Sequence, residues 1–167
     1  MRNLFLLGIL FFLFSTSTGK AQEMDPQKLG ELIESVTDTF EINGNSFRFV
    51  YKDAFLFTIY DENANRMRII SPIIQRSEIE EEQLLNALVA NFHSALDVKY
   101  ALSDEIIWSV FTHPLRELSD HQVLDAIDQV YLANVTFGTT YSSTNLVFPG
   151  NSNKKDESRP KKLIKRD

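Results

Sequence analysis

The sequence predicts an α+β domain in which a five-stranded antiparallel sheet carries helices, in the order α-β-β-β-α-β-β-α. Three observations lead to this prediction. Segments with apolar residues every three or four positions alternate with shorter segments rich in aromatic and β-branched residues. The connections between neighbouring strand segments are short and polar, which is typical of antiparallel hairpins. Two capping boxes mark helix starts that follow strand segments.

The first helix is predicted to begin at Asp25, which can act as the N-cap, with Pro26 in the first helical position. Its end is expected within residues 41–44. The apolar residues of this segment recur at helical spacing and share one face; they are Leu29, Leu32, Ile33, Val36 and Phe40.

Three strands are predicted next. Residues 46–51 alternate aromatic with other side chains, and residues 54–60 are rich in aromatic and β-branched residues, so the two segments form a hairpin around the turn Lys52-Asp53. A third strand covers residues 67–73. Pro72 lies near its end, where a missing backbone donor is tolerated.

The second helix is predicted to begin with a capping box at Ser77 and Glu80. Its apolar stripe is expected to be buried and consists of Leu85, Leu88, Val89, Phe92 and Leu96.

A second hairpin and a third helix complete the domain. Residues 97–102 and 105–112 form the hairpin around Ser103-Asp104. A second capping box, Ser119 with Gln122, then opens the last helix, whose buried side includes Val123, Ile127 and Val130. The segment Tyr141 to Phe148 could extend this helix, cover a sheet edge or form a short strand.

The order of the elements and the segment WSVFTHPLRELSDHQVLDAIDQVY, residues 108–131, resemble the YbjN and type III secretion chaperone-like superfamily. The resemblance extends over residues 24–141. It implies a non-enzymatic, often dimeric fold that binds other proteins. The sequence differs from the cytoplasmic secretion chaperones by an export signal.

That signal is the first 21 residues, which have a basic start, an apolar run over residues 4–14 and small residues before Gln22. The apolar run is too short for a bilayer, which needs about 20 residues, so we expect cleavage rather than an integral membrane span. The protein is expected to be exported, either to the periplasm or to the medium. Residues 22–148 then form one domain, and residues 149–167 form a basic tail expected to be disordered.

The domain is acidic and its tail is basic. Residues 22–150 hold 8 Lys and Arg against 20 Asp and Glu, whereas residues 151–167 hold 7 basic against 3 acidic residues. An acidic domain repels phosphate, so nucleic acid is not an expected partner. The absence of cysteine excludes disulfides, thiolate metal sites and thiol nucleophiles.

No pattern in the sequence indicates a catalytic or metal site. His93, His113 and His121 lack the i, i+4 spacing of a helical metal pair, so we expect neither a metal nor a cofactor. Residues 61–72 begin like a calcium loop but lack the glycine that its sharp turn requires. We expect a polar turn there.

The sequence therefore predicts a non-enzymatic protein-binding or chaperone-like module. Aromatic residues on alternating positions leave apolar side chains on both faces of the sheet, and helices on one face leave the other to be covered. A homodimer, another protein or the segment 141–148 could cover it. The candidate protein-binding residues are Phe47, Phe49, Tyr51, Phe55 and Phe57.

Two other functions stay open at this point. One is an enzyme with a dispersed site around His113, with Asp104 and Glu105 as its carboxylates. The other is a protein that adheres to an anionic surface through its basic tail.

Overall fold

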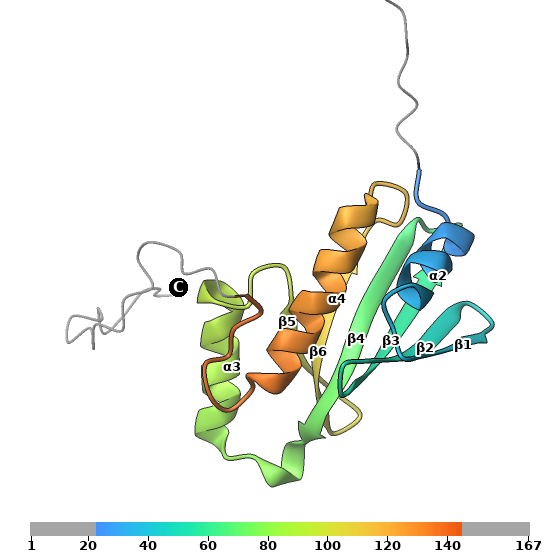
Figure 1. The fold of residues 1–167 in the computed structure, drawn as a ribbon. Helices are drawn as coiled ribbons and strands as arrows, with labels where there is room; N and C mark the ends of the chain where they lie inside the picture. The colour runs from blue at the N-terminus through green and yellow to red at the C-terminus, as the bar shows by residue number, and fades with distance from the viewer. Residues whose placement is uncertain (1–22, 145–167) are drawn as a thin grey trace, which may run out of the picture.

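A computed structural model describes residues 23–144, which fold into one antiparallel sheet accompanied by helices (Figure 1). The sheet has six strands in the order β1-β2-β3-β4-β6-β5, and every neighbouring pair is antiparallel. The elements are α2 (Pro26–Glu34), β1 (Thr39–Asn43), β2 (Ser46–Tyr51), β3 (Ala54–Asp61), β4 (Arg66–Gln75), η1 (Arg76–Glu78), α3 (Glu81–His93), β5 (Lys99–Ser103), β6 (Ile106–His113) and α4 (Asp120–Val135).

The α+β class is confirmed, but the prediction of five strands is wrong because the first helix is shorter than expected. Helix α2 ends at Glu34, and the chain then forms β1 beside β2. Phe40 fits both patterns, since it lies at helical spacing from Leu29 and also faces Phe49 across the β1–β2 pair. The β-branched residues between Glu34 and Phe40 favour the strand, and the observed order is α-β-β-β-β-α-β-β-α.

Both predicted hairpins are present. The β2–β3 turn is Lys52-Asp53, and Lys52 takes a left-handed backbone conformation with φ 57°. The β5–β6 turn lies one residue later than predicted, at Asp104-Glu105, where φ is 51° and 59°. Strand β4 continues two residues past its predicted end, and its register with β6 shifts after Pro72.

The start of the second helix was predicted one turn too early. Ser77 lies within the short 3-10 helix η1, and the capping box is formed by Glu80 and Gln83 instead. The backbone N–H of Glu80 donates to Gln83 Oε1 at 3.0 Å. Helix α3 therefore begins at Glu81, because the reciprocal pair satisfies amide groups at that position.

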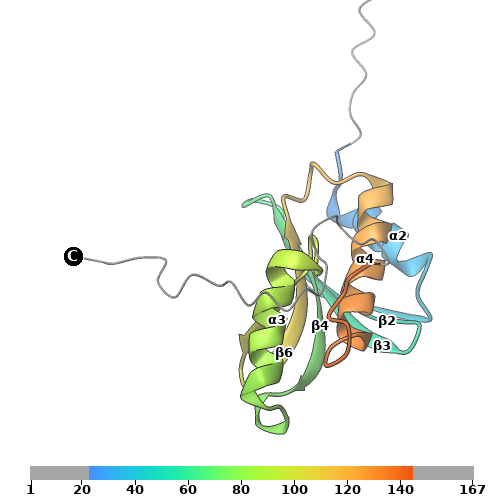
Figure 2. The same ribbon diagram turned by 90° about the vertical axis from the view of Figure 1, so that its left-hand side faces the viewer.

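Helix α4 covers the sheet face on which α2 also lies (Figure 2). Its predicted capping box at Ser119 and Gln122 is confirmed, and so is the burial of Val123, Ile127 and Val130. The hydroxyl of Ser109 on β6 donates to the carbonyl oxygen of Val130 at 3.0 Å. Polar and apolar contacts together fix α4 across the middle of the sheet.

A second polar contact joins α4 to the β2–β3 turn. Lys52 Nζ and Tyr51 Oη both donate to Asp128 Oδ1, at 2.8 Å and 2.9 Å. The Lys52 ammonium also lies over the rings of Tyr51 and Tyr131, 4.8 Å and 4.7 Å from their centroids. Partial burial would raise the pKa of Asp128, but the hydrogen bonds from Lys52 and Tyr51 outweigh it and lower that pKa.

This contact predicts a pH-dependent contribution to stability. A carboxyl group whose pKa is lowered by folding stabilises the protein above its unfolded pKa, and the contribution disappears as the pH falls through the folded pKa. At pH 7 we expect Asp128→Asn to lower the free energy of unfolding by about 0.5 kcal/mol, the size typical of an exposed ion pair. The difference from the unaltered protein should shrink as the pH falls through the lowered pKa of Asp128, because the carboxyl group is then protonated.

Denaturant unfolding at pH 7 and at a series of lower pH values measures this difference, and a double-mutant cycle with Lys52→Met isolates the pair. A coupling free energy that stays constant as the pH falls would contradict the assignment.

Candidate functional site

The five aromatic residues predicted to bind a partner lie on two different faces of the sheet. Phe47 and Phe49 point to the face covered by helices and are only 3% and 2% exposed. Tyr51 is on the same face, half-buried, and donates to Asp128. These three side chains hold the fold together, and Phe47 and Phe49 are not accessible to another protein. Phe55 and Phe57 point to the opposite, outer face.

The strand registers place the apolar residues of the outer face side by side. Phe55 faces Val50, and Phe57 faces Ile70, which in turn faces Val110. The rings of Phe57 and Trp108 lie 6.4 Å apart at an edge-to-face angle. We call this surface the outer apolar band; it consists of Val50, Phe55, Phe57, Ile70, Pro72, Ala101, Trp108 and Val110.

The outer apolar band is not part of the hydrophobic core. Helices α2 and α4 lie on the other face, and α3 lies beside the edge strand β5 (Figures 1 and 2). Phe55 is 67% exposed, and the core cluster of the described residues draws its strand members from the helix-covered face. A contiguous apolar surface spanning five strands is typical of a binding site for another chain.

Helix α3 carries a second exposed apolar surface, and here the prediction of a buried stripe is wrong. Leu85, Leu88, Val89 and Phe92 are between 49% and 87% exposed. The buried residues of α3 are Ala87 and Ala90, on its other side. The apolar spacing indicates which residues share a face, but not whether that face meets the same chain or a different one. We call these four residues the α3 stripe.

Small residues on α3 allow the helix to approach the edge of the sheet closely. Asn91 follows Ala90 and pairs with the backbone of the edge strand β5. Its amide Nδ2 donates to the Tyr100 carbonyl oxygen at 3.1 Å, and its Oδ1 accepts from the Tyr100 N–H at 2.7 Å. The side chain thus takes the place of a neighbouring strand and protects this edge.

The described end of the chain also holds α3 in place. Ser94 donates to the Tyr141 carbonyl oxygen and Ser143 donates to the Ala95 carbonyl oxygen, both at 2.7 Å. The ring of Tyr141 packs against Tyr100, with ring centroids 5.9 Å apart. Burial raises the pKa of Tyr100 to about 12. Residues 141–144 therefore lie on the helix-covered side of the sheet, whereas residues 145–148 lie outside the described part of the chain.

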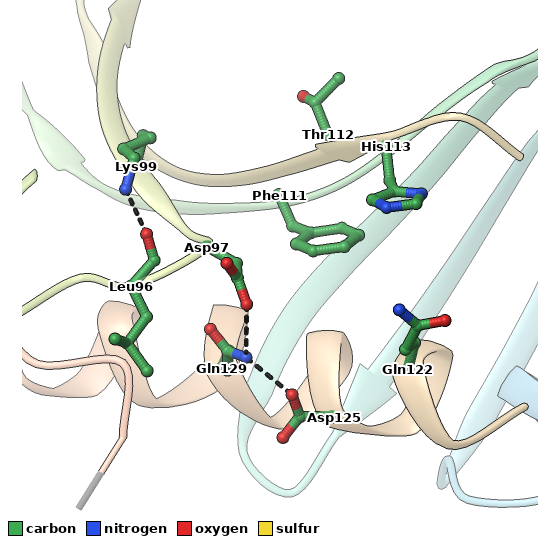
Figure 3. Close-up of a pocket in the computed structure, with 9 residues that line it drawn as sticks. All are labelled: Leu96, Asp97, Lys99, Phe111, Thr112, His113, Gln122, Asp125 and Gln129. Atoms are coloured by element: carbon green, nitrogen blue, oxygen red, sulfur yellow. Dashed lines mark hydrogen bonds between the residues drawn. The ribbon is translucent and has the colours of Figure 1, made fainter. Parts of the chain in front are cut away.

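A cleft of about 380 Å³ opens between the end of β6 and α4 (Figure 3). Gln129 Nε2 donates to Asp125 at 2.7 Å and to Asp97 at 3.4 Å, which brings two carboxylates from different elements together. The ring of His113 stacks on Phe111 at the other end of the cleft. Its Nδ1 lies 2.8 Å from the Pro114 carbonyl oxygen, and since that oxygen only accepts, Nδ1 carries the hydrogen.

The carboxylates proposed as partners of His113 lie elsewhere. Asp104 and Glu105 form the turn before β6, whereas His113 ends that strand. Eight strand residues separate the two groups by more than about 20 Å, at about 3.3 Å per residue. The dispersed site predicted around these three residues is therefore not assembled.

The other candidate ligands are also apart. His93 and His121 are exposed at the end of α3 and the start of α4. Asp61 Oδ1 accepts from the Ala64 N–H at 2.8 Å, as in a polar turn. Within residues 23–144, no three His, Asp or Glu side chains lie close enough to hold a metal ion.

In the same part of the chain, none of the helices is long and apolar enough to cross a membrane.

Comparison with solved structures identifies the fold. The chain is similar to the HopA1-SchA chaperone–effector complex (TM-score 0.53, 12% identity, 65% of this chain and 88% of the other). It is also similar to the ExsC-ExsE complex (TM-score 0.50, 7% identity, 67% and 95%). A third similar structure is the Yersinia pestis type III secretion chaperone SycH in complex with a fragment of YscM2 (TM-score 0.49, 14% identity, 65% and 98%).

The protein therefore has a type III secretion chaperone-like fold, as the sequence resemblance predicted. At such low identity the likeness concerns the fold alone. No protein-family model and no curated protein sequence matches the chain.

Of the eight residues in the outer apolar band, only Phe55 and Phe57 were predicted from the sequence to bind a partner. The sequence placed three further members on strands: Ile70, Trp108 and Val110. Their position beside Phe55 and Phe57 depends on the order of the strands in the sheet, which the alternation within a single strand does not predict. The only signal available was the apolar character of both faces of the strands, which indicated an uncovered face.

Asn91 offers a test of how α3 is attached. We expect Asn91→Ala to lower the free energy of unfolding by about 1–2 kcal/mol, because it removes two hydrogen bonds to a partly buried backbone. It should also increase self-association, because the β5 edge becomes available for pairing.

Thermal unfolding and light scattering measure the two effects, with Asn63→Ala in the exposed β3–β4 turn as the control. Equal behaviour of the two variants would show that Asn91 does not protect the edge.

Proposed function

We propose that this chain is an exported, non-enzymatic module that binds other proteins in a chaperone-like manner through the outer face of its sheet. The observation that carries the proposal is the outer apolar band, which contributes no residue to the hydrophobic core cluster and is exposed or half-buried throughout. The fold adds support, since one of the similar structures is described as a chaperone–effector complex.

The outer apolar band suits a protein ligand better than a small molecule. The band lies on an open sheet face, spans five strands and contains three aromatic rings, Phe55, Phe57 and Trp108. Aromatic side chains on an open apolar surface are enriched where proteins contact one another. Small molecules prefer concave sites that enclose most of their surface. An extended or unfolded segment of another chain fits a flat surface better.

Export rests on the sequence of residues 1–21, which lie outside the described residues. A charged start, a short apolar run and small residues before Gln22 support cleavage and secretion. In that compartment a disulfide-free binding module would contact other exported proteins in the periplasm or in the medium.

The α3 stripe supports a second part of the proposal, a homodimer. Leu85, Leu88, Val89 and Phe92 project from one side of α3 at helical spacing, as expected for a helix that packs on another helix. The α3 stripe is separate from the outer apolar band, so self-association through α3 would leave the band accessible.

Site-specific crosslinking tests the binding surface. A photoreactive phenylalanine analogue at position 55 of the purified full chain should crosslink to a reduced, alkylated, permanently unfolded protein, because Phe55 belongs to the proposed surface and is 67% exposed. The same analogue at exposed Glu117, in the loop before α4, is the matched control. Equal yields at the two positions, or no adduct at position 55, would refute binding at the outer face.

The dimer makes an independent prediction. Leu88→Glu should convert the dimer to a monomer, because a charge within a helix–helix contact is desolvated without a partner. Analytical ultracentrifugation measures the change. The matched control is Leu124→Glu, at an exposed position of α4. A protein that sediments as a monomer before substitution, or a dimer that withstands Leu88→Glu, would rule out α3 as the dimer contact.

A further inference from the structure

The basic residues of the domain are concentrated around the outer apolar band. Residues 23–144 contain eight Lys and Arg, and three of them point to the outer face: Arg48, Arg66 and Arg68. Lys99 also occupies an outward strand position, but its ammonium group donates to the Leu96 carbonyl oxygen beside the cleft. The same part of the chain contains 20 Asp and Glu, of which the outer strand positions hold two, Glu41 and Asp61. An acidic domain thus has one face that is locally positive.

Two of these arginines lie beside the apolar residues of the outer face. Arg48 on β2 faces Phe57 across the β2–β3 pair, and Arg68 on β4 faces Ile59 across the β3–β4 pair. Both side chains are exposed. Glu41 on β1 lies directly opposite Arg48, but the salt bridges found in residues 23–144 involve Lys28 and Lys52, so neither Arg48 nor Arg68 forms an ion pair within the described chain.

We propose that the outer face selects extended protein segments in which carboxylates accompany aromatic or aliphatic side chains. This inference rests on the proposed function and specifies the partner's chemistry. Alternate side chains of an extended segment would pack on the outer apolar band, while its Asp or Glu carboxylates would accept hydrogen bonds from Arg48 and Arg68. Guanidinium groups suit this role because they form paired hydrogen bonds with carboxylates.

Charge also argues against the other occupants of this face. Residues 151–167 of the chain itself carry seven basic against three acidic residues, so like charge disfavours the tail. A second copy placed face to face would bring Arg48 and Arg68 against the same positive surface. Arginines beside aromatic rings also occur in proteins that bind single-stranded nucleic acid, but the net charge of the whole domain opposes a polyanion.

The chain contains a direct reporter of binding. Trp108 is its single tryptophan and belongs to the outer apolar band. A ligand that covers the band should shift Trp108 emission to shorter wavelength. Binding at the α3 stripe, or to the basic tail, should leave this emission unchanged.

The test uses the full chain after the leader and three ten-residue synthetic peptides. The first alternates Asp with Phe and Leu, the second replaces each Asp with Lys, and the third replaces each Phe and Leu with Ser. We expect the first peptide to shift Trp108 emission and the other two to bind at least about tenfold more weakly. Its affinity should fall as salt rises from 50 to 500 mM, because exposed charges are screened.

Charge-reversal variants locate the effect. Arg48→Glu and Arg68→Glu should each weaken binding of the Asp peptide about fivefold, a change typical of exposed charge pairs. Arg116→Glu, in the loop before α4, changes the net charge equally and should have no effect. All variants keep the basic tail, so its attraction for acidic peptides cancels in the comparison.

The outcomes separate this inference from the proposed function. Equal binding of the Asp and Lys peptides, with a Trp108 shift for both, would overturn the acidic selectivity while leaving the outer face as a binding surface. No Trp108 shift with any peptide, together with no crosslinking at Phe55, would overturn both. Arginine-dependent binding of phosphatidylglycerol vesicles or oligothymidylate, without binding of the Asp peptide, would overturn the choice of a protein segment.

Discussion

The packing of α4 against one face of the sheet is the interaction on which the rest of the structure depends. Val123, Ile127 and Val130 fill the space above the central strands, and the Ser109 hydroxyl ties the α4 backbone to β6. Helix α2 occupies the remaining part of the same face. Because α2 and α4 both lie on one face of the sheet, no helix of residues 23–144 covers the opposite face. The outer apolar band is a direct consequence of this arrangement.

The same constraint explains why α3 differs from the other helices. With the helix-covered face already filled, α3 packs beside β5 through Ala87 and Ala90 and is fixed by the Asn91 side chain. Its larger apolar residues then face solvent. The domain consequently has two apolar surfaces of different character: a helical stripe on a helix without Lys or Arg, and a sheet face bordered by Arg48 and Arg68. Different chemistry at the two surfaces would allow self-association and partner binding to occur independently.

The sequence predicted those features that depend on local chemistry. The two hairpins, the capping box at Ser119 and the buried side of α4 follow from alternation, turn residues and caps within short segments. Strand β1 was missed because Phe40 fits a helix and a strand equally well. The α3 face was misassigned because periodicity does not identify what a face contacts. The outer apolar band could not be predicted without the order of the strands in the sheet. The carboxylates of Asp97 and Asp125 come together through hydrogen bonds from Gln129, and no sequence pattern indicates this contact.

Fluorine NMR provides the most direct test of the account, which holds that the outer face is a free binding surface and the helix-covered face is not. A fluorinated phenylalanine would be placed at position 55 in one sample and at position 47 in another, and each sample would be titrated with the alternating Asp, Phe and Leu peptide. We expect the signal from position 55 to shift and broaden while the signal from buried position 47 stays unchanged. An unchanged signal at position 55, or equal changes at both positions, would contradict it.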